Sequence, residues 1–185
     1  MGKKPNPPGP GDHVDRILED WERERPDVDA SPMAVVARIS RAARYLELAS
    51  DAVLRRFDLN YTTFGVLAAL RRAGPPYRLS PSELYGSLLI SSGTMTNRLD
   101  RLEAAGLVVR ERDPRDRRGV LVRLTDRGLA VIEEALVAHL ENEEDMLESL
   151  NRSQRDMLAH NLRRLLKGLE TKSPKARLRD TLDIT

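Results

Sequence analysis

Arginine is concentrated in the short segment DPRDRRG that begins at Asp113. Arg115, Arg117 and Arg118 stand there close to Asp113 and Asp116, so the segment offers several guanidinium groups that can donate hydrogen bonds to phosphate oxygens or enter a groove. The same charges also suit a solvated turn, because runs of charge commonly form solvated surface. Arg115 and Arg117 fit either interpretation, so the segment alone leaves both open.

A second set of polar side chains lies on a predicted helix that begins near Ser92 and ends at Gly106. At about 100° per residue, the apolar residues Leu99 and Leu102 share one side with Met95, and small or polar residues face outward. Asn and Arg can make bidentate hydrogen bonds to base edges, and Ser and Thr suit phosphates, although any amphipathic helix has a polar outside. The candidate nucleic-acid contacts are Ser80, Ser92, Thr94, Thr96, Asn97, Arg98, Arg101, Arg115, Arg117 and Arg118.

Two short helices and a hairpin must position these side chains. The sequence SPSE at Ser80 has the form of a capping box and predicts a helix over 81–87, which a short turn joins to the helix after Ser92. The runs LVVRER and VLVRLT on either side of the arginine-rich segment alternate as two strands of a hairpin do. Such an order allows a helix to lie in the major groove of DNA while an arginine at the hairpin tip enters the minor groove.

Longer helices are predicted on both sides of this region. Ser31 and Pro32 favour the start of a helix over 32–57, and Asn60 can cap the next helix. A short amphipathic helix from Asp12 precedes them, and helices over 126–147 and 153–169 follow the hairpin. The sequence therefore predicts a mainly α fold with a two-stranded β wing and long terminal helices.

Composition excludes several classes of function. The 185 residues carry a formal net charge of +2 and contain no cysteine, which excludes disulfides, thiolate catalysis and cysteine metal sites. The three histidines, at positions 13, 139 and 160, lack metal-ligand spacing, and the acidic run ENEED is better explained as a solvated helix face than as a cation site. With no glycine-rich phosphate loop, nucleophile elbow or membrane-spanning apolar run, we expect a cytoplasmic protein that is not an enzyme and uses no metal or cofactor.

The stretch from Ser91 to Gly128 resembles the core of the MarR family of winged helix-turn-helix transcription regulators. The family's Asp-x-Arg wing motif is present at Asp116 and Arg118, and its Leu-Thr-x-x-Gly motif begins at Leu124. The resemblance covers about residues 32–170. It implies a homodimer built from the terminal helices that binds a pseudo-palindromic DNA operator and is released by a small molecule. It also implies that Arg118 enters the minor groove and that Asp116 orients the arginines of the wing.

The added N-terminal helix with Trp21 is similar to the urate-responsive branch of that family. That branch uses a Trp on this helix, an Asp on the third helix and an Arg on the recognition helix; Trp21 and Arg98 match, whereas Gly65 stands where the Asp is expected. This departure, together with Arg38 on the second helix, favours an anionic ligand other than urate. The candidate ligand-binding residues are therefore Trp21, Arg38 and Arg98. As alternatives to ligand binding, Trp21 packs the added helix and Arg38 forms a surface ion pair.

The resulting expectation is a transcriptional repressor that binds operator DNA as a homodimer and responds to a small anionic effector. The alternatives are a regulator without a ligand, an activator, a non-specific architectural DNA-binding protein and a helical protein-interaction module. The expected organisation is a disordered lead at 1–11, N-terminal helices for dimerisation and ligand binding at 12–57, a winged helix-turn-helix DNA-binding domain at 58–125, C-terminal dimerisation helices at 126–170 and a polar tail at 171–185.

Overall fold

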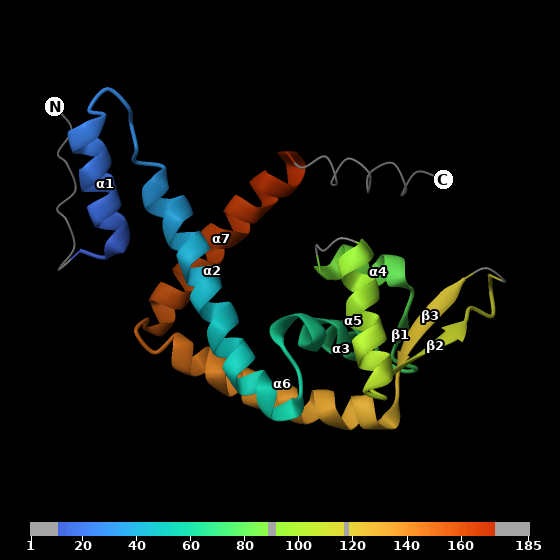
Figure 1. The fold of residues 1–185 in the computed structure, drawn as a ribbon. Helices are drawn as coiled ribbons and strands as arrows, with labels where there is room; N and C mark the ends of the chain where they lie inside the picture. The colour runs from blue at the N-terminus through green and yellow to red at the C-terminus, as the bar shows by residue number, and fades with distance from the viewer. Residues whose placement is uncertain (1–10, 89–91, 117–118, 173–185) are drawn as a thin grey trace. The chain divides into compact units, whose positions relative to one another are not determined.

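The computed structural model describes residues 11–88, 92–116 and 119–172, which form two compact units, one through Asn142 and the other from Glu143. The second unit holds the last residues of helix α6 and the whole of helix α7, whose bounds are given below. Within the described ranges no helix is long and apolar enough to cross a membrane. The elements in chain order are α1 (His13–Glu24), α2 (Met33–Leu54), the 3-10 helix η1 (Arg55–Phe57), α3 (Tyr61–Arg72), β1 (Arg78–Leu79), α4 (Pro81–Leu88), α5 (Ser92–Ala104), β2 (Val108–Arg112), β3 (Val120–Leu124), α6 (Asp126–Met146) and α7 (Arg152–Lys172) (Figure 1).

Side-chain caps set the start of several helices. Asn60 accepts hydrogen bonds from the backbone N–H groups of Thr62 and Thr63, which confirms the cap predicted for α3. Ser80 and Glu83 form the predicted capping box of α4, in which the Ser80 N–H donates to Glu83 Oε2 at 2.7 Å. The cap predicted at Ser31 is wrong, because α2 begins at Met33 without a side-chain cap.

The β-sheet has three strands rather than the two predicted, in the order β1-β3-β2, and both pairings are antiparallel. β2 and β3 form the expected hairpin, with Val108 opposite Leu124 and Arg112 opposite Val120. β1 is only two residues long and pairs with β3 from the other side. Two residues are too few to show the alternating pattern that predicts a strand.

The core of the first unit lies between the helix pair α4–α5, α3, the sheet and α6. Buried apolar residues from all of these elements meet there, including Leu67 and Leu70 of α3, Leu84 of α4, Val122 of β3 and Ile132 of α6. The predicted inner face of α5 is confirmed at Leu99 and Leu102, each 2% exposed. Burial of each such side chain contributes roughly 1.5–3 kcal/mol, so α5 and the sheet are attached to one common core.

The Leu-Thr-x-x-Gly sequence forms the junction between the wing and α6. Thr125 Oγ1 donates to the carbonyl oxygen of Gly106 at 2.8 Å and accepts from the Gly128 N–H at 2.9 Å, so it caps α6 while it holds the end of α5. A Cβ placed on Gly128 would lie 1.9 Å from the carbonyl oxygen of Leu107. Glycine is therefore required there for α6 to contact the backbone at the base of β2.

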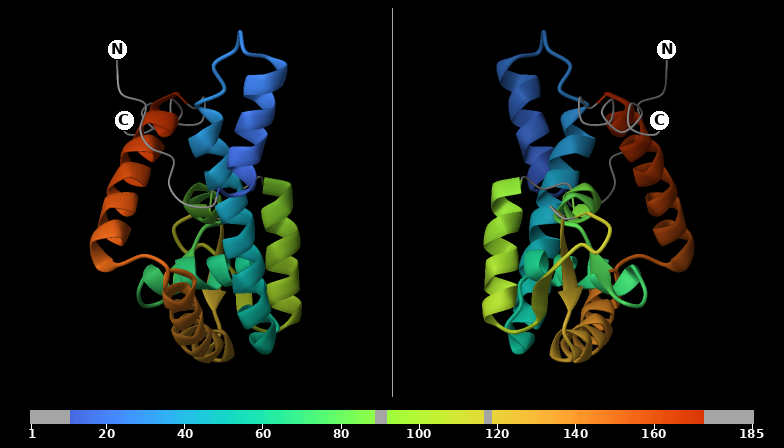
Figure 2. Two further views of the ribbon diagram at one scale, coloured as in Figure 1. Left: turned by 90° about the vertical axis from the view of Figure 1, so that its left-hand side faces the viewer. Right: turned by 90° about the vertical axis from the view of Figure 1, so that its right-hand side faces the viewer.

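The first helix packs along α2, as both views in Figure 2 show. Asp12 caps α1 by accepting from the N–H groups of Val14 and Asp15, and Val14 is 1% exposed. Arg38 of α2 binds the carboxylates of Asp12 and Asp15, with its Nε 2.9 Å from Asp12 Oδ2. A clasp of one arginine and two carboxylates thus joins the two helices.

Candidate nucleic-acid interface

Helix α5 presents the predicted polar face to solvent. Thr96, Asn97 and Arg101 are exposed, whereas Arg98 is half-buried on the flank of the helix. Burial lowers the pKa of the Arg98 guanidinium. The side chains of Ser92 and Thr94 lie outside the described residues. The helix packs against α3, α4 and β2 through its apolar side, so its outward face is available for contact with another molecule.

Backbone hydrogen bonds between described residues connect the two sides of the wing near its tip. The Asp113 N–H donates to the carbonyl oxygen of Gly119 at 2.9 Å, and the Gly119 N–H donates to the carbonyl oxygen of Asp116 at 2.8 Å. A Cβ on Gly119 would lie 2.8 Å from the Cβ of Asp113, so the turn is closely packed at this point. Arg112 and Arg115 are exposed. Arg117 and Arg118 lie outside the described residues, so the role expected of Asp116 toward them stays a prediction.

Ser80 lies where the chain enters α4. Its hydroxyl donates to Glu83 Oε2 at 2.7 Å, and hydrogen bonds from Ser80 lower the pKa of the Glu83 carboxyl. The capping box therefore occupies the Ser80 hydroxyl in the free protein. A phosphate contact by Ser80 stays a prediction.

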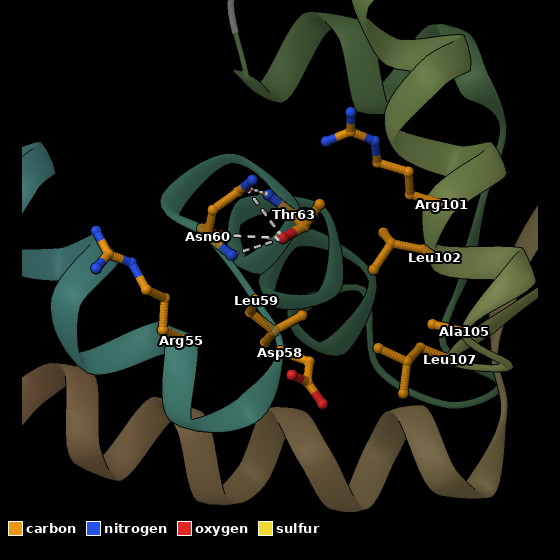
Figure 3. A pocket seen from close by; sticks show the side chains of 9 residues that line it. All are labelled: Arg55, Asp58, Leu59, Asn60, Thr63, Arg101, Leu102, Ala105 and Leu107. Atoms are coloured by element: carbon orange, nitrogen blue, oxygen red, sulfur yellow. Dashed lines mark hydrogen bonds between the residues drawn. The ribbon is translucent and has the colours of Figure 1, made fainter.

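A pocket of about 360 Å³ opens between η1, the start of α3 and the C-terminal half of α5 (Figure 3). Arg55 and Arg101 reach it from opposite sides, and Asp58 lies at its rim. The oxygen of the Asn60 side chain is used in the α3 cap, and its amide group retains N–H groups that can donate. The remaining lining residues are Leu59, Thr63, Leu102, Ala105 and Leu107.

Sequence reasoning did not find this pocket, except for Arg101, which was predicted as a DNA contact. The lining side chains come from three elements that are separated along the chain, so no spacing rule relates them. A detectable signal was the sequence RRFDLN from Arg55, in which two arginines precede a helix cap. Asp58 adopts a left-handed backbone conformation with a φ of 56°, which turns the chain sharply between η1 and α3.

The three residues predicted to bind a ligand, Trp21, Arg38 and Arg98, lie on three different helices, and a common site for them stays a prediction. Trp21 lies on α1, is 44% exposed and belongs to a helix that packs on α2. Arg98 belongs to α5, whose neighbours are α3, α4 and β2. Arg38 makes the surface ion pair that the sequence left open, since its guanidinium binds Asp12 and Asp15.

Comparison with known proteins agrees with this arrangement of a helix pair, recognition helix and wing. Residues 57–119 match the model of the MarR family. The chain is 40% identical over 156 residues to the HTH-type transcriptional regulator PecS of Dickeya dadantii, a match that covers 84% of this chain and 94% of PecS. These relatives are transcriptional regulators and not enzymes.

Two solved structures are similar in fold. A MarR variant from E. coli complexed with operator DNA superimposes with a TM-score of 0.68 at 27% identity and covers 75% of this chain and 99% of that one. BpsR of Bordetella bronchiseptica, whose DNA binding is regulated by 6-hydroxynicotinic acid, gives a TM-score of 0.65 at 28% identity and covers 71% of this chain and 91% of that one. The chain belongs to the MarR family of winged helix-turn-helix transcriptional regulators.

Proposed function

We propose that this regulator is a repressor that binds a pseudo-palindromic operator as a homodimer and leaves it when a small anionic ligand binds. The observation that carries the proposal is the attachment of α5 and the β2–β3 wing to one core, which presents an exposed polar helix face beside an arginine-bearing hairpin. In this proposal Asn97 and Arg101 read base edges in the major groove, and Arg118 enters the minor groove.

The proposal is tested by a mobility shift on the DNA upstream of the protein's own gene, with a random duplex of equal length as the competitor. Arg118→Ala is expected to weaken operator binding by at least about tenfold without unfolding the protein. Arg16→Ala removes an exposed arginine from α1 and serves as the control for net charge. Equal affinity for both duplexes would support the architectural alternative, and near wild-type affinity of the Arg118 variant would refute the wing assignment.

The homodimer is supported by apolar surface on two helices, one in each unit. In α2 only Ser50 and Leu54 are buried, and Val36, Tyr45 and Leu46 are among its exposed apolar side chains. In α7 no residue is buried, and four of its five leucines recur at positions 158, 162, 165 and 169, the alternating spacing of four and three that forms a seam between helices. A second copy of the chain covers both surfaces in this proposal.

The ligand proposal rests on the pocket between η1 and α5. Two arginines and the Asn60 amide supply donors for a carboxylate, and the leucines supply an apolar wall for a flat ring. A ligand held by Arg55 and Arg101 joins the recognition helix to η1, so it favours one placement of α5 over others. PecS and BpsR are similar to this chain, and BpsR is regulated by such a carboxylated ring.

A DNA-release assay at constant salt tests the ligand and its place together. The probes are 6-hydroxynicotinic acid and urate, with 6-hydroxynicotinamide as the uncharged control. Arg55→Gln is expected to retain DNA binding and to lose release if the pocket is the effector site. Loss of release in Trp21→Ala or Arg38→Ala, with Arg55→Gln unaffected, would instead support the set Trp21, Arg38 and Arg98. Absence of release by every probe would favour a regulator that responds to no anionic ligand of this class.

A further inference from the structure

Arg110, in the middle of β2, contacts two acidic residues of the recognition helix. Its Nη2 lies 2.6 Å from Asp100 Oδ1, and its Nη1 donates to Glu103 Oε2. The backbone N–H of Arg110 also donates, at 3.0 Å, to Glu103 Oε1. Three hydrogen bonds therefore connect one residue of the wing to one face of α5.

These contacts restrain the orientation of α5 as well as its distance from β2. Asp100 and Glu103 are three residues apart on α5, so they lie side by side along one face of the helix. A planar guanidinium that binds both restrains the rotation of α5 about its axis and its tilt against β2. The Arg110 side chain is 30% exposed, and an ion pair at this depth is screened less by salt than a fully exposed pair.

On the opposite face of β2, Glu111 also forms ion pairs with neighbouring elements. Glu111 accepts from Arg123 of β3 at 3.1 Å and from Arg78 of β1 at 3.3 Å, so it ties the three strands together. Successive side chains of a strand point to opposite faces, so Arg110 holds the helix while Glu111 holds the sheet. The wing is thus restrained within itself and against α5.

We propose that Arg110 is a positioning residue that keeps the recognition helix and the wing in one fixed geometry and makes no contact with DNA. The inference rests on the proposed operator binding and adds to it how the two DNA-contacting elements are held in register. Arg110 also compensates the charges of Asp100 and Glu103, which lie on the helix that approaches the phosphates. The free protein therefore holds the geometry for binding in advance, which lowers the ordering cost at the interface.

The salt dependence of operator affinity distinguishes positioning from a phosphate contact. Arg110→Met is expected to weaken operator binding about tenfold while the slope of log K against log salt stays at the wild-type value. Arg112→Met is the matched control, because Arg112 is an exposed arginine two residues further along the same strand. Loss of a phosphate contact would instead make this negative slope shallower by about 0.9. That result for Arg110→Met would overturn the proposal.

Substitution of Asp100 and Glu103 gives an independent test, because positioning and simple electrostatics predict opposite changes in operator affinity. The double variant Asp100→Asn, Glu103→Gln removes two negative charges beside the DNA, which simple electrostatics predicts will strengthen binding. Positioning by Arg110 predicts weaker binding, and adding Arg110→Met to this variant should change the affinity no further. Stronger operator binding by the double variant would refute the proposal. A further loss of affinity when Arg110→Met is added to it would also refute the proposal.

A conservative variant and an unfolding measurement separate loss of positioning from loss of folding. Arg110→Lys retains one charge and one contact, so it should recover part of the affinity lost in Arg110→Met, and urea unfolding shows whether each variant is folded. If Arg110→Met does not fold, the double variant of the acidic partners decides alone. Absence of salt-dependent operator binding by the wild-type protein would refute the proposed function, whereas wild-type binding that Arg110→Met leaves unchanged would refute only this inference.

Discussion

Gly128 occupies a position in which no side chain fits. Gly128→Ala would bring a Cβ to 1.9 Å from the carbonyl oxygen of Leu107, so α6 and β2 would have to separate. We expect a loss of about 3 kcal/mol in the free energy of unfolding, at the upper end for overpacked cores. Urea unfolding at a single protein concentration measures it, because the proposed dimerisation would make stability depend on concentration.

Gly168→Ala is the control for this substitution. Gly168 lies within α7, and a Cβ placed there meets no atom within 4 Å. Alanine should stabilise the helix by about 0.5–1 kcal/mol, because glycine loses more backbone freedom on folding. Equal effects at the two glycines would contradict the packing described for the junction between the wing and α6.

The Glu111 carboxyl makes the stability of the wing depend on pH. Hydrogen bonding to Arg123 and Arg78 lowers the pKa of this carboxyl. Its stabilising contribution is therefore complete above the ordinary glutamate pKa of about 4.3 and is lost as the pH falls through the lower folded value. Glu111→Gln should flatten the fall in urea midpoint between about pH 5 and pH 3. Glu134→Gln, on the exposed face of α6, is the control and should leave that fall unchanged.

At the scale of elements, the clasp between Arg38 and the acids of α1 has a testable consequence. Arg38→Ala removes both ion pairs, so α1 should lose protection in hydrogen exchange while α3 and α6 keep theirs. Arg44→Ala is the matched control, because Arg44 forms its ion pair with Glu47 inside α2. Unchanged protection of α1 would mean that apolar packing around Val14 suffices to hold it.

Most helices and the hairpin were predictable because their signals are local. The caps at Asn60 and Ser80, the end of α5 at Gly106 and the alternating pattern of β3 all lie within a few residues of the element that they define. Gly106 indeed has a φ of 67°, which glycine adopts readily. The start of α2 was misplaced because Ser31 followed by Pro32 is compatible with a cap, whereas the Ser31 N–H is instead bound by Asp29.

The candidate site was predictable only in part. The outward face of α5 and the position of the wing follow from periodicity. The contacts of Arg110 with Asp100 and Glu103, the third strand and the pocket at Asp58 depend on pairings between elements that are distant in the sequence. No single-sequence rule relates such residues, so these features emerged only from the fold.

At the scale of the whole molecule, the leucine seam of α7 is expected to hold two copies together. The double substitution Leu165→Glu, Leu169→Glu places charge on the seam and should convert the dimer into monomers in sedimentation velocity. Operator affinity should fall with it, because each copy would then read a half-site alone. Lys167→Glu changes charge on the opposite side of the helix, at about 100° per residue, and should leave the dimer intact. A wild-type monomer would refute the seam.

The junction at Thr125 and Gly128 also restricts where the chain can change in length. One residue inserted between Leu124 and Gly128 would rotate α6 by about 100° relative to β3. The turn would move Gly128 away from Leu107 and direct Ile132, Ala135 and His139, which form the buried side of α6, away from the core. Variants of this regulator that remain folded should therefore tolerate insertions in other connections before they tolerate a single added residue here.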